Sequence, residues 1–162
     1  MRNIAKSTFW VKNWRELGPQ EANRTMVTQH YLLPRSGVLS LDRSIRMEEC
    51  GKAHSFYYVE EESRREGTPP LERRKVISRR DYETLLTQRH TKLRPIEEVR
   101  RDFWIGNEAL CLRVFGGRQA GLVLFHALPT RITEIPDGWG WELQNVTSDP
   151  RYDNRRLAEM SK

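Results

Sequence analysis

A stretch in the middle of the chain carries most of its surplus positive charge. Residues 72–101 contain ten lysines and arginines and five acidic residues, a surplus of five positive charges in a chain with a net charge of +6. Such a gathering of cations can bind nucleic acid, an acidic membrane or an acidic protein. The alternative is a charged face that is simply solvated. The candidate docking belt consists of Arg73, Arg79, Arg80, Arg89, Lys92 and Arg94.

A second charged set follows the period of a β-strand. In residues 97–105, one face carries Val99, Phe103 and Ile105, and the other carries Glu98, Arg100 and Asp102. In residues 110–115, Arg113 points away from the leucines. Period two places these charged side chains on one side of a sheet. An open sheet would expose them to water, whereas a closed barrel with a polar interior would enclose them. Both arrangements fit the alternation.

The elements that must position these residues are mainly strands. Alternating or β-branched segments predict strands at residues 44–48, 55–61, 71–77, 96–105, 110–115 and 121–128. Gly106-Asn107 is a strong two-residue hairpin signal between two of them. We expect the tryptophans at 139 and 141 to pack against the core.

One helix interrupts the strands. Ser78 and Asp81 have the spacing of a capping box, and Tyr82, Leu85 and Leu86 follow at helical spacing. The pattern predicts a helix that runs to about residue 88 and lays a narrow apolar stripe on the sheet.

Length and composition limit the remaining possibilities. A chain of 162 residues fits one domain, and we expect residues 1–162 to form it. No apolar run approaches the roughly 18 residues of a membrane span. Cys50 and Cys111 have no partners at metal-binding spacing, so a reduced compartment is expected, with one disulfide as the alternative.

The N-terminal segment is basic. The first fifteen residues contain four cations and no acid, namely Arg2, Lys6, Lys12 and Arg15. This composition is typical of a mitochondrial targeting segment, and a plain basic strand is the alternative.

The order of the motifs resembles one protein family. The closing segment Val146-Thr147-Ser148-Asp149-Pro150-Arg151-Tyr152, followed by Asn154 and Leu157-Ala158, is similar to the end of CYTH domains, the triphosphate tunnel proteins. Upstream, residues 44–46 resemble the family's R-x-R strand, 72–77 its E-x-E strand, 96–100 its K-x-R strand, and 112–115 and 121–128 its acidic strands. The resemblance covers residues 9–158.

This resemblance implies an α+β fold, a mainly antiparallel eight-stranded β-barrel or tunnel with a few short helices. In the family, basic residues inside the tunnel hold a triphosphate, and carboxylates hold divalent metals that assist hydrolysis or cyclisation. The tunnel positions transferred to this sequence are Arg46, Glu72, Arg74, Arg100 and Arg113.

The sequence departs from the family pattern at several of the expected charges. Acids stand at two expected basic positions, and arginines stand at two expected acidic ones. The departures are at Ile4, Lys6, Thr8, Ser44, Glu61, Arg74, Glu98, Arg113 and His126. Because buried charges persist when they are paired, we expect the exchanged charges to neutralise one another without a metal or a cofactor.

These departures lead to a functional expectation. The leading hypothesis is a non-catalytic CYTH-like domain, not an enzyme, that serves as a structural or interaction subunit of a larger protein complex. A mitochondrial or ribonucleoprotein complex is favoured, and a cytoskeletal or ciliary assembly in the cytoplasm or cilium comes next. The alternatives are a binder or weak hydrolase of triphosphate-bearing ligands, and RNA binding through the belt at 73–94.

Overall fold

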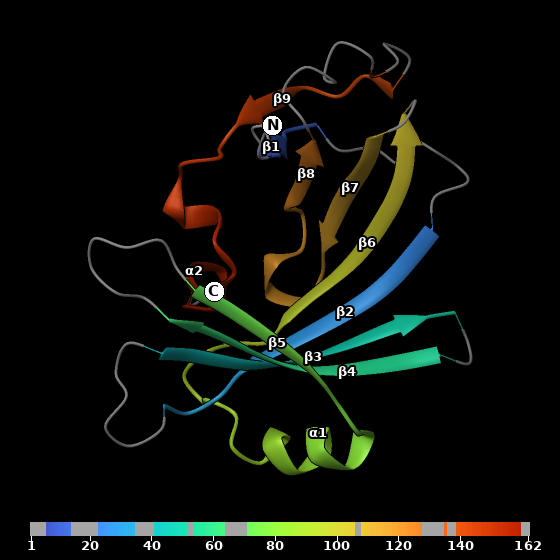
Figure 1. Ribbon diagram of the computed structural model, residues 1–162. Coiled ribbons are helices and arrows are strands. Elements are labelled where there is room, and N and C mark those ends of the chain that lie inside the picture. The colour runs from blue at the N-terminus through green and yellow to red at the C-terminus, as the bar shows by residue number, and fades with distance from the viewer. Residues whose placement is uncertain are drawn as a thin grey trace.

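The protein is a strongly curved β-sheet with two short α-helices, described by a computed structural model (Figure 1). The structure describes residues 6–13, 23–34, 41–51, 54–63, 71–105, 108–127, 135 and 139–159. Its strands are β1 Ser7–Val11, β2 Asn23–Tyr31, β3 Leu41–Cys50, β4 His54–Ser63, β5 Leu71–Ile77, β6 Ile96–Ile105, β7 Glu108–Phe115, β8 Val123–Ala127 and β9 Leu143–Asn145. The α-helices are α1 Arg79–Leu86 and α2 Asn154–Glu159, and short 3-10 turns form at Gly117–Gln119 and Pro150–Tyr152.

The strands pair antiparallel in one sheet, in the order β5-β4-β3-β2-β6-β7-β8-β1-β9. The antiparallel architecture agrees with the sequence prediction. The predicted eight-stranded closed barrel is corrected in two respects. Within the described residues the sheet has nine strands, and hydrogen bonds do not join its two edges, β5 and β9. The extra strand, β9, is three residues long and lacks the alternation that would have marked it.

The predicted strands form where alternation indicated them. The segments 71–77 and 96–105 agree residue for residue with β5 and β6, and the others lie within one to three residues of β3, β4, β7 and β8. Ile105 pairs with Glu108 across β6 and β7, as a tight hairpin requires. The turn residues 106–107 themselves lie outside the described residues, as do Ile4 and Leu128.

The outer face of the sheet carries two apolar clusters. One contains Phe9, Phe103 and Phe125, and the predicted cover by Trp139 and Trp141 is confirmed because both pack on this cluster. The other lies under the helix α1, on the outer side of β3, β4 and β5 (Figure 1). Much of the apolar core is therefore outside the concave face, which leaves that face free for polar side chains.

The helix α1 forms as its capping pattern predicts, although it ends two residues early. The Ser78 side chain accepts a hydrogen bond from the backbone N–H of Asp81 at 3.0 Å. Tyr82 is buried, and its ring lies 5.0 Å from that of Tyr57 on β4. Within the described ranges, no helix has the length and apolar character needed to cross a bilayer.

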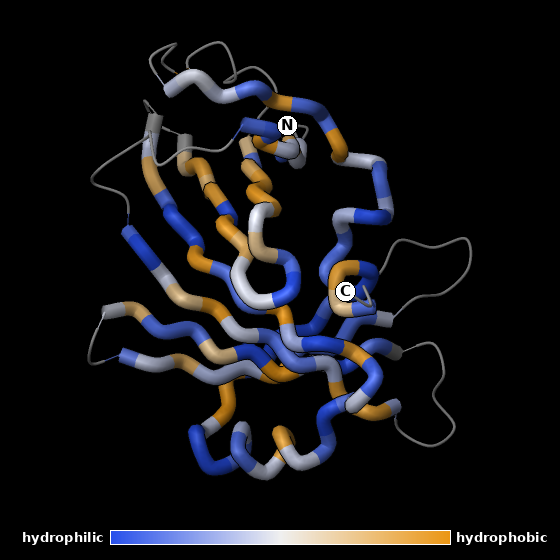
Figure 2. Tube along the Cα trace, turned by 180° about the vertical axis from the view of Figure 1, so that it is seen from behind, coloured by the Kyte–Doolittle hydropathy of each residue, from blue (hydrophilic) through white to orange (hydrophobic). Residues whose placement is uncertain are grey.

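The helix α2 lies on the concave side of the sheet, opposite α1 (Figure 1). Its Leu157 and Ala158 are buried against Tyr31, Ile96 and Leu124, among others. Figure 2 shows hydrophilic and hydrophobic residues alternating along the strands that frame this space. These residues form a third apolar cluster, which covers part of the concave face and leaves the rest of that face polar.

Candidate functional site

The concave face contains a polar cavity of about 570 Å³. All five predicted tunnel positions line it: Arg46, Glu72, Arg74, Arg100 and Arg113. They come from β3, β5, β6 and β7, and the closing segment 146–155 forms part of the opposite wall. Of the alternating charged residues, Arg100 and Arg113 line this cavity and Glu98 is buried beside them, whereas Asp102 is exposed and lies outside the lining.

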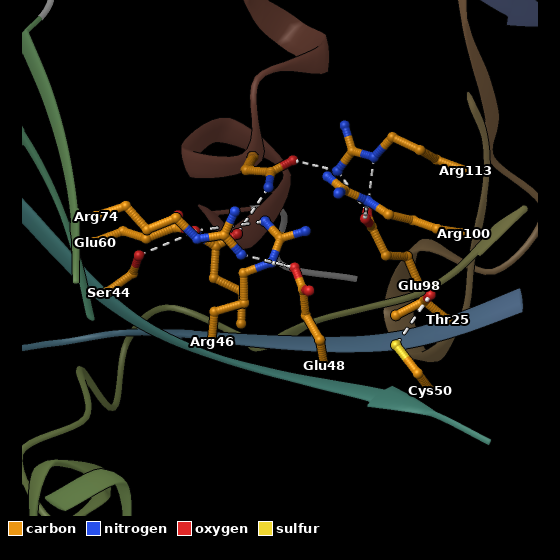
Figure 3. A network of polar contacts seen from close by, with 12 residues as sticks. Thr25, Ser44, Arg46, Glu48, Cys50, Glu60, Arg74, Glu98, Arg100 and Arg113 are labelled. Atoms are coloured by element: carbon orange, nitrogen blue, oxygen red, sulfur yellow. Dashed lines mark hydrogen bonds and ion pairs between the residues drawn. The ribbon is translucent and has the colours of Figure 1, made fainter. Parts of the chain in front are cut away.

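The first charged cluster joins β3, β4 and β5 (Figure 3). The buried Arg46 donates from Nε to Glu48 Oε1 at 2.9 Å, and Arg74 donates from Nη2 to the same oxygen at 2.8 Å. Glu60 lies 3.8 Å from Arg46 Nη1 and 3.5 Å from Arg74 Nε. Arg74 also stacks on Tyr58, with its guanidinium carbon 3.8 Å from the ring centre. Two guanidinium groups are therefore held side by side.

Arg46 retains an unused donor. Its Nη2 atom is buried and has no hydrogen-bond partner in the described structure. Burial lowers the pKa of Arg46, and the charge of Arg100 lowers it further. An orphaned buried N–H group is costly, so this atom is suited to an acceptor that a bound molecule would supply.

The second charged cluster centres on Glu98, whose side chain is 2% exposed. Its carboxylate accepts from Arg100 Nε at 2.8 Å and from Arg113 Nε at 2.9 Å (Figure 3). Burial alone would raise the pKa of Glu98, but the charges and hydrogen bonds of the two arginines outweigh burial and hold that pKa below its ordinary value. The predicted pairing of exchanged charges is confirmed here for Glu98 and Arg113.

Glu61 is among the residues that line the cavity, but its recorded ion pair is not with another of the exchanged charges. Glu61 lies opposite Arg43 in the β3–β4 register and pairs with it at 3.4 Å, whereas Glu60 is the residue that contacts Arg46 and Arg74.

An amide chain connects the second cluster to β2, β3 and α2. Arg113 Nη2 donates to Asn154 Oδ1 at 2.8 Å, and Asn154 Nδ2 donates to Gln29 Oε1 at 2.7 Å. Gln29 Nε2 donates in turn to Ser44 Oγ at 2.9 Å. Ser44, which replaces a family arginine, is thus part of a satisfied polar network that holds α2 in place.

His126 is a further polar group in the cavity lining. Its Nδ1 lies 3.1 Å from the hydroxyl oxygen of Thr8 on the neighbouring strand β1. Burial, reinforced by the charges of Arg113 and Arg100, lowers its pKa to about 4. The ring is therefore neutral at pH 7 and can accept a proton.

Sequence reasoning missed several residues of the site: Gln29, Glu48 and Glu60. The signal for Glu48 was present, because it follows Ser44 and Arg46 at intervals of two on β3. No sequence signal marks Gln29, whose role depends on the pairing of β2 with β3.

The described carboxylates do not fit the divalent metal that the fold family implies. No group of three histidine, cysteine, aspartate or glutamate side chains in the described ranges is close enough to hold a metal ion. Glu48, Glu60 and Glu98 all contact arginines. A metal ion bound by these carboxylates would be repelled by the neighbouring guanidinium groups. Two like unit charges 4 Å apart repel by roughly 4 kcal/mol at an effective dielectric constant near 20, and the repulsion between a dication and a guanidinium group is twice that. We therefore derive no chemical step through a metal.

The docking belt is divided between two places. Arg73 lines the cavity, and Arg79, Arg80, Arg89, Lys92 and Arg94 are exposed residues outside its lining. Arg79 pairs with Glu83 within α1 at 3.1 Å.

Cys50 and Cys111 are both free thiols, so the alternative of a disulfide between them is not realised.

Two solved structures share this architecture. One is described as the hypothetical protein NE1496, with 24% identity, a TM-score of 0.63 and coverage of 96% of this chain and 97% of that chain. The other is described as the inorganic triphosphatase NE1496, with 23% identity, a TM-score of 0.64 and coverage of 99% and 97%. No protein-family model matches the sequence, and neither does any curated protein.

These comparisons confirm the resemblance to triphosphate tunnel proteins at the level of the fold. They also correct the expectation that the protein is not an enzyme, because a structure that shares the fold over 99% of this chain is an inorganic triphosphatase. That expectation rested on exchanged charges. The exchanges add Arg74 and Arg113 to the cavity wall, beside the retained Arg46 and Arg100.

Proposed function

We propose that the protein binds a triphosphate-bearing ligand in the concave cavity and hydrolyses its terminal phosphoanhydride bond. One observation carries this proposal. Arg46, Arg100 and Arg113 converge on one cavity, and each is held along one edge by a carboxylate. Their remaining guanidinium nitrogens include a buried donor without a partner, Arg46 Nη2. Fixed guanidinium groups suit phosphate oxygens because they offer parallel donors in a planar array.

The size of the cavity supports a ligand of this class. A volume of about 570 Å³ lies within the range of small-molecule sites. The wall also contains acids, among them Glu62 and Glu72, which lie opposite each other on β4 and β5, and Asp149 and Asp153 of the closing segment. A polyanion would therefore lie toward Arg46, Arg100 and Arg113 and away from those acids.

The side chains provide the elements of a hydrolytic reaction. The arginines would hold the terminal phosphoryl group and stabilise the charge on its oxygens in the transition state. His126, neutral at pH 7, would accept a proton from a water molecule as its oxygen bonds to the terminal phosphorus. The bridging P–O bond breaks at the same time, and the shortened phosphate chain leaves with that electron pair while orthophosphate is formed. A bound polyanion would offset the charges of Arg113 and Arg100, which contribute to the low pKa of His126, and would raise that pKa toward its ordinary value.

Phosphate release from tripolyphosphate tests this proposal. We expect a rate above background for the parent protein and a rate at least tenfold lower for Arg113→Ala. Arg118→Ala is the matched control, because Arg118 is exposed in the turn Gly117–Gln119 and does not line the cavity. Absence of phosphate release together with no ligand-induced rise in melting temperature would refute the proposal.

We also propose that the exposed part of the docking belt contacts an anionic partner, either a protein subunit or RNA. Arg80, Arg89, Lys92 and Arg94 are exposed, and no acidic side chain is recorded as their ion-pair partner within the described residues. Exposed, unpaired cations raise association rates with anionic surfaces. Binding of an RNA oligonucleotide at two salt concentrations tests the RNA partner, and co-purification from the native source tests the protein partner.

A further inference from the structure

We infer that the cavity recognises the free polyphosphate anion rather than its magnesium complex. This inference rests on the proposed function and specifies the charge state of the ligand that the site accepts. The carboxylate acceptors beside the arginines of the cavity already have hydrogen-bond partners, whereas some of the guanidinium donors do not.

The acceptors around the arginines are already used. Both oxygens of Glu98 accept from guanidinium groups, Oε1 from Arg100 at 2.8 Å and Oε2 from Arg113 at 2.9 Å. Glu48 Oε1 accepts from Arg46 at 2.9 Å and from Arg74 at 2.8 Å. A metal that coordinated either carboxylate would take it from two arginines at once and would leave cations in the cavity wall without their partners.

The donors of Arg46 and Arg100, in contrast, are not all used. Arg46 Nη2 is buried without a hydrogen-bond partner. Arg100 donates to Glu98 from Nε, and no hydrogen bond from its terminal nitrogens is recorded among the described residues. Such a site needs a ligand that brings acceptor oxygens and negative charge, and a free polyphosphate brings the most of both.

A magnesium complex of the same ligand fits this pattern less well. The metal occupies phosphate oxygens that would otherwise accept from the arginines, and it adds two positive charges next to guanidinium groups. Among the described residues, two exposed carboxylates of the cavity wall have no recorded ion pair, namely Glu72 on the edge strand β5 and Asp153 in the closing segment. No described group of three acidic, histidine or cysteine side chains could hold a metal ion, so these carboxylates are a poor ligand set for magnesium, which prefers near-octahedral oxygen coordination.

Calorimetric titration with tripolyphosphate tests the inference on the parent protein. One titration contains EDTA, and the other contains enough magnesium to complex more than nine-tenths of the ligand, at equal ionic strength. We expect binding in EDTA and an apparent Kd at least tenfold higher with magnesium. Arg118→Ala, as the control, should show the same ratio, and Arg46→Ala should bind more weakly in EDTA.

The possible failures are distinguishable. Equal or tighter binding of tripolyphosphate with magnesium would overturn this inference and leave the proposed function intact. If Glu72→Gln then lost the binding seen with magnesium, the metal would be assigned to the acids around Glu72. Absence of binding under both conditions would overturn the proposed function itself.

Discussion

Replacement of Glu98 by glutamine removes the negative charge at the centre of the second charged cluster. Glu98 is the shared partner of Arg100 and Arg113, and the side chain of Arg113 is 10% exposed. Loss of one member of a buried ion pair typically costs about 3–5 kcal/mol. Arg100 is 30% exposed and can recover part of its hydration, so we take the lower end, about 3 kcal/mol.

This loss corresponds to a decrease in melting temperature of roughly 6–12 °C for a chain of this length. The pKa of Glu98 is lowered in the folded protein, so the folded state binds fewer protons at this site than the unfolded chain. Its contribution to stability is therefore complete at pH 7 and is lost as the pH falls below about 4. The difference between the parent and Glu98→Gln should shrink over the same range.

The matched control is Glu97→Gln, which makes the same change at an exposed position on the opposite face of β6. It should alter stability by less than about 1 kcal/mol. Tripolyphosphate should raise the melting temperature of Glu98→Gln more than that of the parent, because the ligand would replace the missing charge beside Arg100 and Arg113. Equal stability of Glu98→Gln and Glu97→Gln at pH 7 would refute the claim that Glu98 is an essential buried counter-ion.

Three further predictions concern other parts of the molecule. The pKa of His126 is about 4 in the folded protein, below its ordinary value, so between pH 7 and pH 5 the unfolded chain binds a proton at this histidine that the folded protein does not. The free energy of unfolding should therefore decrease by up to about 2 kcal/mol from pH 7 to pH 5. Melting curves of His126→Gln should be less dependent on pH over that range, and an unchanged dependence would contradict the assignment. Tyr82→Ala should destabilise the protein by about 3 kcal/mol in urea unfolding, because the ring is buried between α1 and β4, whereas a loss below about 1 kcal/mol would mean that this contact is not tightly packed. Simultaneous Arg79→Glu, Arg80→Glu and Arg89→Glu should leave unfolding nearly unchanged and weaken assembly with an anionic partner in a salt-sensitive way, and normal incorporation would identify a solvated face.

The sequence predicted the strands β3 to β8 from their patterning, but it did not mark β2, a nine-residue strand that lies between β3 and β6 in the sheet. In the segment 96–105, Val99, Phe103 and Ile105 share one face and Glu98, Arg100 and Asp102 share the other, and the segment forms a strand of the same length. The helix was also predictable, since Ser78 supplies a capping side chain immediately before the apolar stripe. The strand β9 was missed because its three residues pair with β1 from a distant part of the chain.

The candidate site was only partly predictable, for reasons of register. Positions on one strand at intervals of two, such as Arg46 and Glu48, share a face whatever the fold. Partners on different strands depend on pairing, so neither the contact of Arg74 with Glu48 nor the amide chain through Asn154 has a local signal. The same limit applies to Glu60, whose contacts with Arg46 and Arg74 across strands have no local signal.

The central claim is that arginines in the concave cavity form a binding site for a polyphosphate. Calorimetric titration of the parent and of Arg46→Ala, Arg100→Ala and Arg113→Ala with tripolyphosphate tests it most directly. We predict one ligand per chain and a loss of about 2 kcal/mol, or roughly thirtyfold in Kd, for each variant, since hydrogen bonds to charged groups are of that strength. Absence of binding by the parent, or binding that all three variants retain unchanged, would contradict the claim.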